Sequence, residues 1–91
     1  MYVMNVPVIS TTHIRPSTAE FLNSDLVPRW PIVAAYDGGW FVNTEALEDT
    51  LPGDLYRVLQ WAADNNYQWV RLDGQIGDII EDLPNYTAEW E

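Results

Sequence analysis

Two residue types are missing from this 91-residue chain, which has no cysteine and no lysine. Without cysteine there is no disulfide, thiolate zinc site or cysteine nucleophile. Without lysine, a phosphate-cradling glycine loop lacks the residue that completes it. Long apolar runs are missing too, because no stretch approaches the roughly 20 residues that span a bilayer. The N-terminal segment lacks the features of a secretory signal. We therefore expect a cytoplasmic protein without a membrane partner.

Positive charge is scarce, and the fourteen carboxylates are unevenly distributed along the chain. Residues 45–91 hold eleven carboxylates against two arginines, a formal charge of −9, and residues 1–44 hold three against two, a formal charge of −1. Such a field attracts basic protein surfaces and repels nucleic acid. We therefore expect a basic protein partner and no direct binding to nucleic acid. A surface that only confers solubility remains an alternative, although such surfaces usually mix both signs.

The composition suits one acidic α+β domain spanning residues 1–91. Its apolar share is 47% and its aromatic share 13%, both too high for a disordered acidic chain. The order β-α-β-β-α-β predicts a small antiparallel or mixed sheet with two helices packed on one face. The predicted elements are a strand at 3–11, a helix at 18–23, strands at 32–36 and 40–43, a helix between 51 and 66, a strand at 67–72, and a strand or helical turn at 76–83.

Three local patterns support this assignment. Asp37-Gly38-Gly39 between two β-rich runs predicts a hairpin, because glycine accepts the positive φ of a tight turn. Ser17 and Glu20 match a capping box at the start of the first helix. Apolar residues at helical spacing predict the second helix. They are Leu55, Val58, Leu59 and Ala62.

Candidates for catalysis or metal binding are few. His13 is the only histidine, and neither a nucleophile elbow nor an orienting third group accompanies it. We interpret it as a structural residue at a strand end. The acids near Gly74 and Gly77 do not follow the spacing of a calcium-binding EF-hand loop. We therefore expect no enzyme activity, no metal and no cofactor.

Four blocks of the sequence, ISTTHIRPSTAEFL, YDGGWFV, LPGDLYRVLQWAADNNYQWVRLD and DLPNY, resemble a small family of uncharacterised acidic domains. Members of that family are encoded on bacterial plasmids, phages and integrative elements. The resemblance covers nearly the whole chain, but its motifs are structural. It implies the setting of anti-CRISPR and anti-restriction proteins, some of which are acidic DNA mimics. It implies no catalytic or ligand residues.

Charge and resemblance together predict a non-enzymatic inhibitor of a bacterial nucleic-acid-binding defence complex, acting through a DNA-mimic-like surface in the host cytoplasm. Tyr56 and Trp61 are expected to add desolvated contact, because charge alone gives steering more than affinity. The predicted acidic face consists of Glu45, Glu48, Asp49, Asp54, Asp73, Asp78, Glu81 and Asp82. The alternative is an immunity or adaptor protein that binds a basic partner such as a toxin nuclease. A small enzyme with a carboxylate pair is a third hypothesis.

Overall fold

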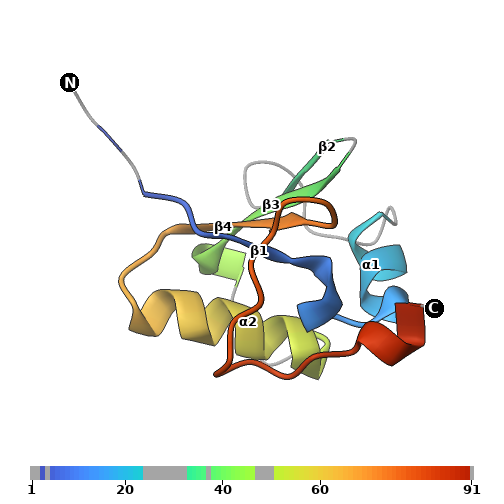
Figure 1. Cartoon of the computed structure of the whole chain (residues 1–91). Coiled ribbons are helices and arrows are strands. Elements are labelled where there is room, and N and C mark those ends of the chain that lie inside the picture. The colour runs from blue at the N-terminus through green and yellow to red at the C-terminus, as the bar shows by residue number, and fades with distance from the viewer. Residues whose placement is uncertain (1–2, 4, 24–32, 37, 47–50, 91) are drawn as a thin grey trace.

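A computed structural model of the chain contains a four-stranded mixed sheet and two helices (Figure 1). It describes residues 3, 5–23, 33–36, 38–46 and 51–90, without the side chains of residues 33–35 and 46. The strands are β1 (Val8–Ser10), β2 (Val33–Tyr36), β3 (Gly39–Asn43) and β4 (Trp69–Asp73), and the helices are α1 (Pro16–Leu22) and α2 (Gly53–Asp64). Single 3-10 turns occur at Thr11–His13, Thr44–Ala46 and Thr87–Trp90. The predicted α+β class and element order are confirmed.

The strands lie in the order β1-β4-β3-β2. The predicted hairpin is present, since β2 and β3 pair antiparallel with Tyr36 opposite Gly39. Glycine is required at this position, because a Cβ on Gly39 would lie 1.7 Å from the carbonyl oxygen of Leu72 in β4. β3 pairs antiparallel with β4, whereas β1 pairs with β4 in parallel. The first strand thus joins the last strand.

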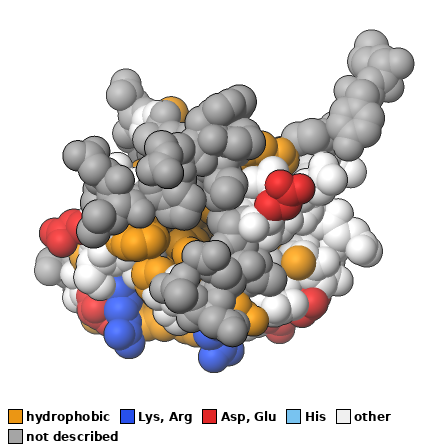
Figure 2. Space-filling model, turned by 180° about the vertical axis from the view of Figure 1, so that it is seen from behind, with side chains coloured by type: hydrophobic (Ala, Val, Ile, Leu, Met, Phe, Trp, Pro, Cys, Tyr) orange, Lys and Arg blue, Asp and Glu red, His pale blue; other side chains and the backbone are white. Residues whose placement is uncertain are grey.

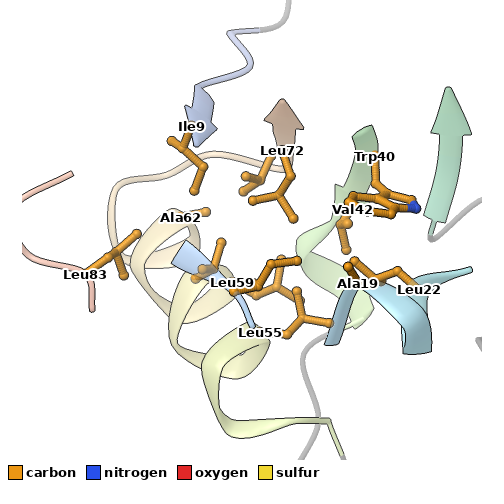
Figure 3. Packing of buried hydrophobic residues seen from close by; sticks show 13 residues of the cluster. Ile9, Ala19, Leu22, Trp40, Val42, Leu55, Leu59, Ala62, Leu72 and Leu83 are labelled. Atoms are coloured by element: carbon orange, nitrogen blue, oxygen red, sulfur yellow. The ribbon is translucent and has the colours of Figure 1, made fainter. Parts of the chain in front are cut away.

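The hydrophobic core lies between one face of the sheet and the two helices (Figure 3). Alternate strand residues supply the sheet side of this core, and they are Ile9, Trp40, Val42, Val70 and Leu72. The predicted stripe of α2 supplies the opposite side, together with Ala19 and Leu22 of α1. Fully burying one such aliphatic side chain stabilises a fold by about 1.5–3 kcal/mol. The predicted packing of both helices on one face is therefore confirmed.

The start of α1 differs from the prediction. The N-cap residue is Arg15, whose side chain makes no capping hydrogen bond, so the capping box of Ser17 and Glu20 does not form. Instead the Asp54 carboxylate accepts hydrogen bonds from the backbone N–H of Arg15 at 2.7 Å and from the Thr18 hydroxyl at 2.6 Å. A carboxylate from α2 therefore replaces the local cap.

Two other predicted elements changed in extent or kind. The strand expected at 3–11 is restricted to β1. The element expected at 76–83 is neither a helix nor a strand, and it makes a single isolated bridge between Asp78 and Ile9. The end of α2 agrees with the prediction, because Asn65 is its C-cap and Asn66 adopts a φ of 66°.

Candidate functional site

Two residues of the predicted acidic face are buried, and their assignment to the surface was wrong. Asp54 is 9% exposed and Asp73 is 4% exposed. Burying a carboxylate is costly unless it is paired and hydrogen-bonded, and both residues meet that condition. Asp54 caps α1, as described above, and Asp73 is the centre of a network on the sheet. Neither carboxylate is available to a partner.

The network around Asp73 lies on the sheet face opposite the helices. Its Oδ2 atom accepts hydrogen bonds from the Tyr36 hydroxyl at 2.7 Å and from the Arg71 guanidinium at 3.1 Å. Its Oδ1 atom accepts two backbone N–H groups, from Gln75 at 2.8 Å and Ile76 at 3.0 Å. These hydrogen bonds hold the pKa of the Asp73 carboxyl well below its usual range. The bond from the Ile76 N–H makes the largest contribution, and the bond from the Tyr36 hydroxyl makes the next largest. Asp73 is therefore a structural anion.

Arg71 joins this network to the aromatic side chains of β2 and β3. Its Nε donates a hydrogen bond to the Tyr36 hydroxyl at 2.8 Å, and its guanidinium carbon lies 4.9 Å from the centroid of that ring and 5.6 Å from the centroid of Phe41. Burial raises the pKa of the Tyr36 phenol, and the hydrogen bond to Tyr36 raises the pKa of Arg71. Sequence analysis missed this network, although the i, i+2 spacing of Arg71 and Asp73 in a strand places both on one face.

The exposed residues of the predicted acidic face gather mainly on one loop. Glu48 and Asp49 lie outside the described residues, and Glu45 is exposed on the turn after β3. The remaining exposed members belong to the segment of residues 74–83, which we call the acidic loop. They are Asp78, Glu81 and Asp82.

The acidic loop also exposes apolar side chains. Ile76 is 63% exposed and Ile79 is 57% exposed. In the described part of the chain, no ion pair neutralises the carboxylates of this loop. Exposed apolar patches that polar residues surround mark protein interaction sites. The acidic loop carries two exposed isoleucines among its exposed carboxylates.

Backbone hydrogen bonds hold the middle of the acidic loop against β1. The N–H of Asp78 donates to the carbonyl of Val8 at 3.0 Å, and the N–H of Ser10 donates to the carbonyl of Asp78 at 2.9 Å. Gly77 permits this close approach, because a Cβ there would lie 2.2 Å from the carbonyl oxygen of Ile9. The side chain of Asp78 remains exposed to solvent.

The end of the acidic loop is held by His13, which is completely buried. Its Nδ1 lies 2.7 Å from the Pro84 carbonyl oxygen, and its Nε2 lies 2.8 Å from the Ile80 backbone N–H. A carbonyl only accepts and an amide N–H only donates, so Nδ1 carries the proton and Nε2 accepts. Leu83 packs beside α2 between these contacts (Figure 3). Both ring nitrogens of His13, which lies just after β1, are thus bonded to backbone groups, which supports its interpretation as a structural residue.

A groove of about 390 Å³ lies between α2 and the end of the acidic loop. Both predicted aromatic anchors, Tyr56 and Trp61, line this α2 groove, as does Asp82 of the predicted acidic face. The Trp61 ring packs against Tyr67, with 6.0 Å between the ring centroids. The other lining residues are Arg57, Gln60, Asp64, Asn65 and Leu83. Three residues that were predicted separately as partner contacts thus lie around one groove.

On the face shown in Figure 2, the acidic side chains lie at separate places and do not form one continuous patch. Two arginines are paired with acids, since Arg15 lies 3.4 Å from Glu89 and Arg71 lies 3.1 Å from Asp73. The exposed acids of the described chain are Glu20, Glu45, Asp64, Asp78, Glu81, Asp82 and Glu89.

Comparison with known proteins places the chain in a family. Residues 6–90 match the model of the C-terminal domain of a family of unknown function, DUF5983. The chain belongs to this family. No curated protein and no solved structure matches it. This family is one of unknown function, so the resemblance to acidic domains of mobile elements and its anti-CRISPR setting stay predictions.

Within the residues that the structure describes, no three His, Asp or Glu side chains gather as a metal site requires. No helix of the described segments is both long and apolar enough to cross a membrane.

Proposed function

We propose that this domain is a non-enzymatic binding protein that docks on a basic, nucleic-acid-binding surface of a bacterial protein through its acidic loop. The observation that carries the proposal is the presence of two exposed isoleucines, Ile76 and Ile79, among three exposed carboxylates on one loop. A few well-packed, desolvated residues near the centre of an interface supply most of its affinity. Charges mainly supply association rate and selectivity.

The proposed partner follows from charge complementarity. Proteins that bind DNA or RNA meet the phosphates with arrays of arginine and lysine. A domain with a formal charge of −10 is attracted to such arrays. By occupying the partner's nucleic-acid-binding surface, the domain would inhibit the partner in the bacterial cytoplasm, as an anti-CRISPR or anti-restriction protein does. The contact relies on one loop instead of a long DNA-like row, because the carboxylates of Asp54 and Asp73 are used inside the fold.

The second candidate function is that of an immunity or adaptor protein for a basic partner such as a toxin nuclease. The exposed isoleucines suit this function as well, because an apolar contact does not require that the partner's surface bind nucleic acid. The two functions differ in competition by nucleic acid. Duplex DNA displaces an inhibitor that occupies the nucleic-acid groove, whereas it leaves a protein bound beside that groove in place.

Capture from a bacterial lysate identifies the partner, and titration of the purified partner then tests the surface. The test variant carries Asp78→Asn, Ile79→Ser and Glu81→Gln, which all alter exposed side chains. We expect its affinity for the partner to fall by about tenfold or more. Wild-type binding should also weaken as salt rises, because exposed charges are screened beyond about 8–10 Å.

A matched control removes the same kinds of side chain elsewhere. It carries Val3→Ser, Glu20→Gln and Glu89→Gln, of which Val3 is 72% exposed and both glutamates are exposed and outside the predicted acidic face. We expect this control to bind within about twofold of wild type, because exposed positions outside an interface change little. Equal affinities of the test variant, the control and the wild type would show that the acidic loop is not the docking surface.

A further inference from the structure

We infer that the α2 groove receives an arginine side chain of the basic partner, and this inference rests on the proposed function. Two aromatic residues, Tyr56 and Trp61, and two carboxylates, Asp64 and Asp82, line the groove. A guanidinium is planar and cationic, so it stacks on an aromatic ring while its edge donates hydrogen bonds to carboxylates. A lysine ammonium is a point charge without a plane to stack. The groove therefore favours arginine.

The groove has room for one arginine side chain, and residues of the core and of its surroundings hold its walls. Its volume of about 390 Å³ is near the lower end of the range for small-molecule sites, which is about 300–1,000 Å³. Asp82 is held beside α2 by its neighbour Leu83, which is 8% exposed and part of the core. Tyr67, which lies between α2 and β4 in the sequence, packs against the Trp61 ring. The groove thus exists before binding, which reduces the entropy lost on binding.

Arg57 lines the same groove and is the natural competitor of an incoming arginine. It is exposed, and no ion pair of Arg57 occurs among the described residues. Its positive charge opposes a second guanidinium in the groove. Removing this charge should therefore strengthen arginine binding, whereas removing the Asp82 charge should weaken it. The opposite signs separate a cation site from a groove that binds apolar groups.

The test uses a blocked peptide, acetyl-Gly-Arg-Gly-Arg-Gly-amide, titrated into the whole protein. Its counterparts contain citrulline or lysine in place of arginine. The signal is the NMR resonance of the Trp61 indole N–H, assigned by its loss in Trp61→Phe. We expect the arginine peptide to shift this resonance, the lysine peptide to bind about threefold more weakly, and the uncharged citrulline peptide to cause no shift.

Three variants test whether the charges that line the groove control binding of the arginine peptide. We expect Asp82→Asn to weaken the arginine peptide by about threefold and Arg57→Gln to strengthen it by about threefold, as exposed ion pairs allow. Arg15→Gln is the control, because it removes one positive charge from a residue that pairs with Glu89 and does not line the groove. It should change the affinity by less than about 1.5-fold.

The inference is wrong if citrulline shifts the Trp61 resonance as arginine does, if Arg15→Gln acts like Arg57→Gln, or if arginine causes no shift. All these outcomes use wild-type protein or surface variants, so they do not depend on a variant that fails to fold. These outcomes also do not contradict the proposed function. That function is tested separately by the variant at Asp78, Ile79 and Glu81, and none of these residues lines the groove.

Discussion

The hydroxyl of Thr18 in α1 donates a 2.6 Å hydrogen bond to the carboxylate of Asp54 in α2, and both residues are buried. The same carboxylate accepts the backbone N–H of Arg15 at 2.7 Å. Asp54 also lies in the first turn of its own helix, where a negative charge is favourable. One side chain therefore stabilises the starts of both helices and fixes their relative position.

Replacing this carboxylate should destabilise the fold. We expect Asp54→Ala to lower the free energy of unfolding by about 2–3 kcal/mol, because the Thr18 hydroxyl and the Arg15 N–H lose a charged acceptor. Urea unfolding followed by circular dichroism measures the change. The control is Asp64→Ala on the same helix, an exposed acid whose loss should cost less than about 0.5 kcal/mol. Equal effects of the two changes would contradict the capping role.

The pKa of Asp73 makes its contribution to stability depend on pH. Hydrogen bonds from Ile76 and Tyr36 lower its pKa in the folded state, so folding favours the charged carboxylate. This contribution is present above the unfolded pKa of about 3.9 and is lost as pH falls below it. We expect Asp73→Asn to be less stable than wild type at pH 7, with a gap that narrows below about pH 4. Urea midpoints of both proteins from pH 7 to 2 measure this gap, and a constant gap would contradict the prediction.

His13 should control the end of the acidic loop. His13→Phe leaves the Ile80 N–H and the Pro84 carbonyl without their buried partner, which costs about 1–3 kcal/mol for each unsatisfied group. We expect faster hydrogen exchange at the Ile80 amide than in wild type. The Asp78 amide is the internal control, because its bond to the Val8 carbonyl does not involve His13. Unchanged exchange at Ile80 would show that His13 does not hold the loop.

Two glycines should respond oppositely to alanine. A Cβ on Gly39 would lie 1.7 Å from the Leu72 carbonyl oxygen, whereas a Cβ on Gly53 meets nothing within 4 Å. We expect Gly39→Ala to destabilise the fold by about 3 kcal/mol, because β3 must move away from β4. Gly53→Ala should be neutral or stabilising by up to about 1 kcal/mol, because it restricts the unfolded chain. Thermal unfolding of the two variants compares them directly, and equal melting temperatures would contradict the tight contact.

The protein alone should bind neither DNA nor RNA. Its formal charge of −10 repels phosphates, and Arg71 is already paired with Asp73. A gel shift with duplex and single-stranded DNA and with RNA at physiological salt tests this. Retention of any of them at micromolar protein would instead indicate a nucleic-acid site on this domain and would oppose the proposed partner.

Local sequence signals predicted most of the fold. The hairpin follows from the glycines after Tyr36, and α2 follows from an apolar stripe at helical spacing, because both depend on neighbouring residues. The start of α1 was predicted wrongly, because its cap comes from Asp54, more than thirty residues away along the chain. The parallel pairing of β1 with β4 was not predicted for the same reason. No local pattern encodes such contacts.

The site was predicted in part. Acidity identified the loop, but it did not distinguish exposed acids such as Asp78 from Asp73, whose buried carboxylate is bonded by Tyr36 of β2 and by Arg71 of its own strand. Tyr56 and Trp61 were predicted as anchors because they are aromatic and because Trp61 lies off the apolar stripe of its helix. That they line one groove with Asp82 could be seen only in the fold. The exposure of Ile76 and Ile79 went unpredicted, because apolar residues in an irregular segment have no periodicity that shows which of them face solvent.

The parallel pairing of β1 with β4 has a consequence for the order of folding. Val8 pairs with Arg71, so the edge strand cannot dock before nearly all the intervening chain has been made and β4 has formed. Closing so long a loop costs entropy before the contact is gained, which slows folding in proteins rich in distant contacts. The hairpin and α2 involve only nearby residues and have no such delay. We therefore expect β1 and the acidic loop that binds it to be the last parts to assemble, so that the proposed docking surface is completed only when the whole domain has folded.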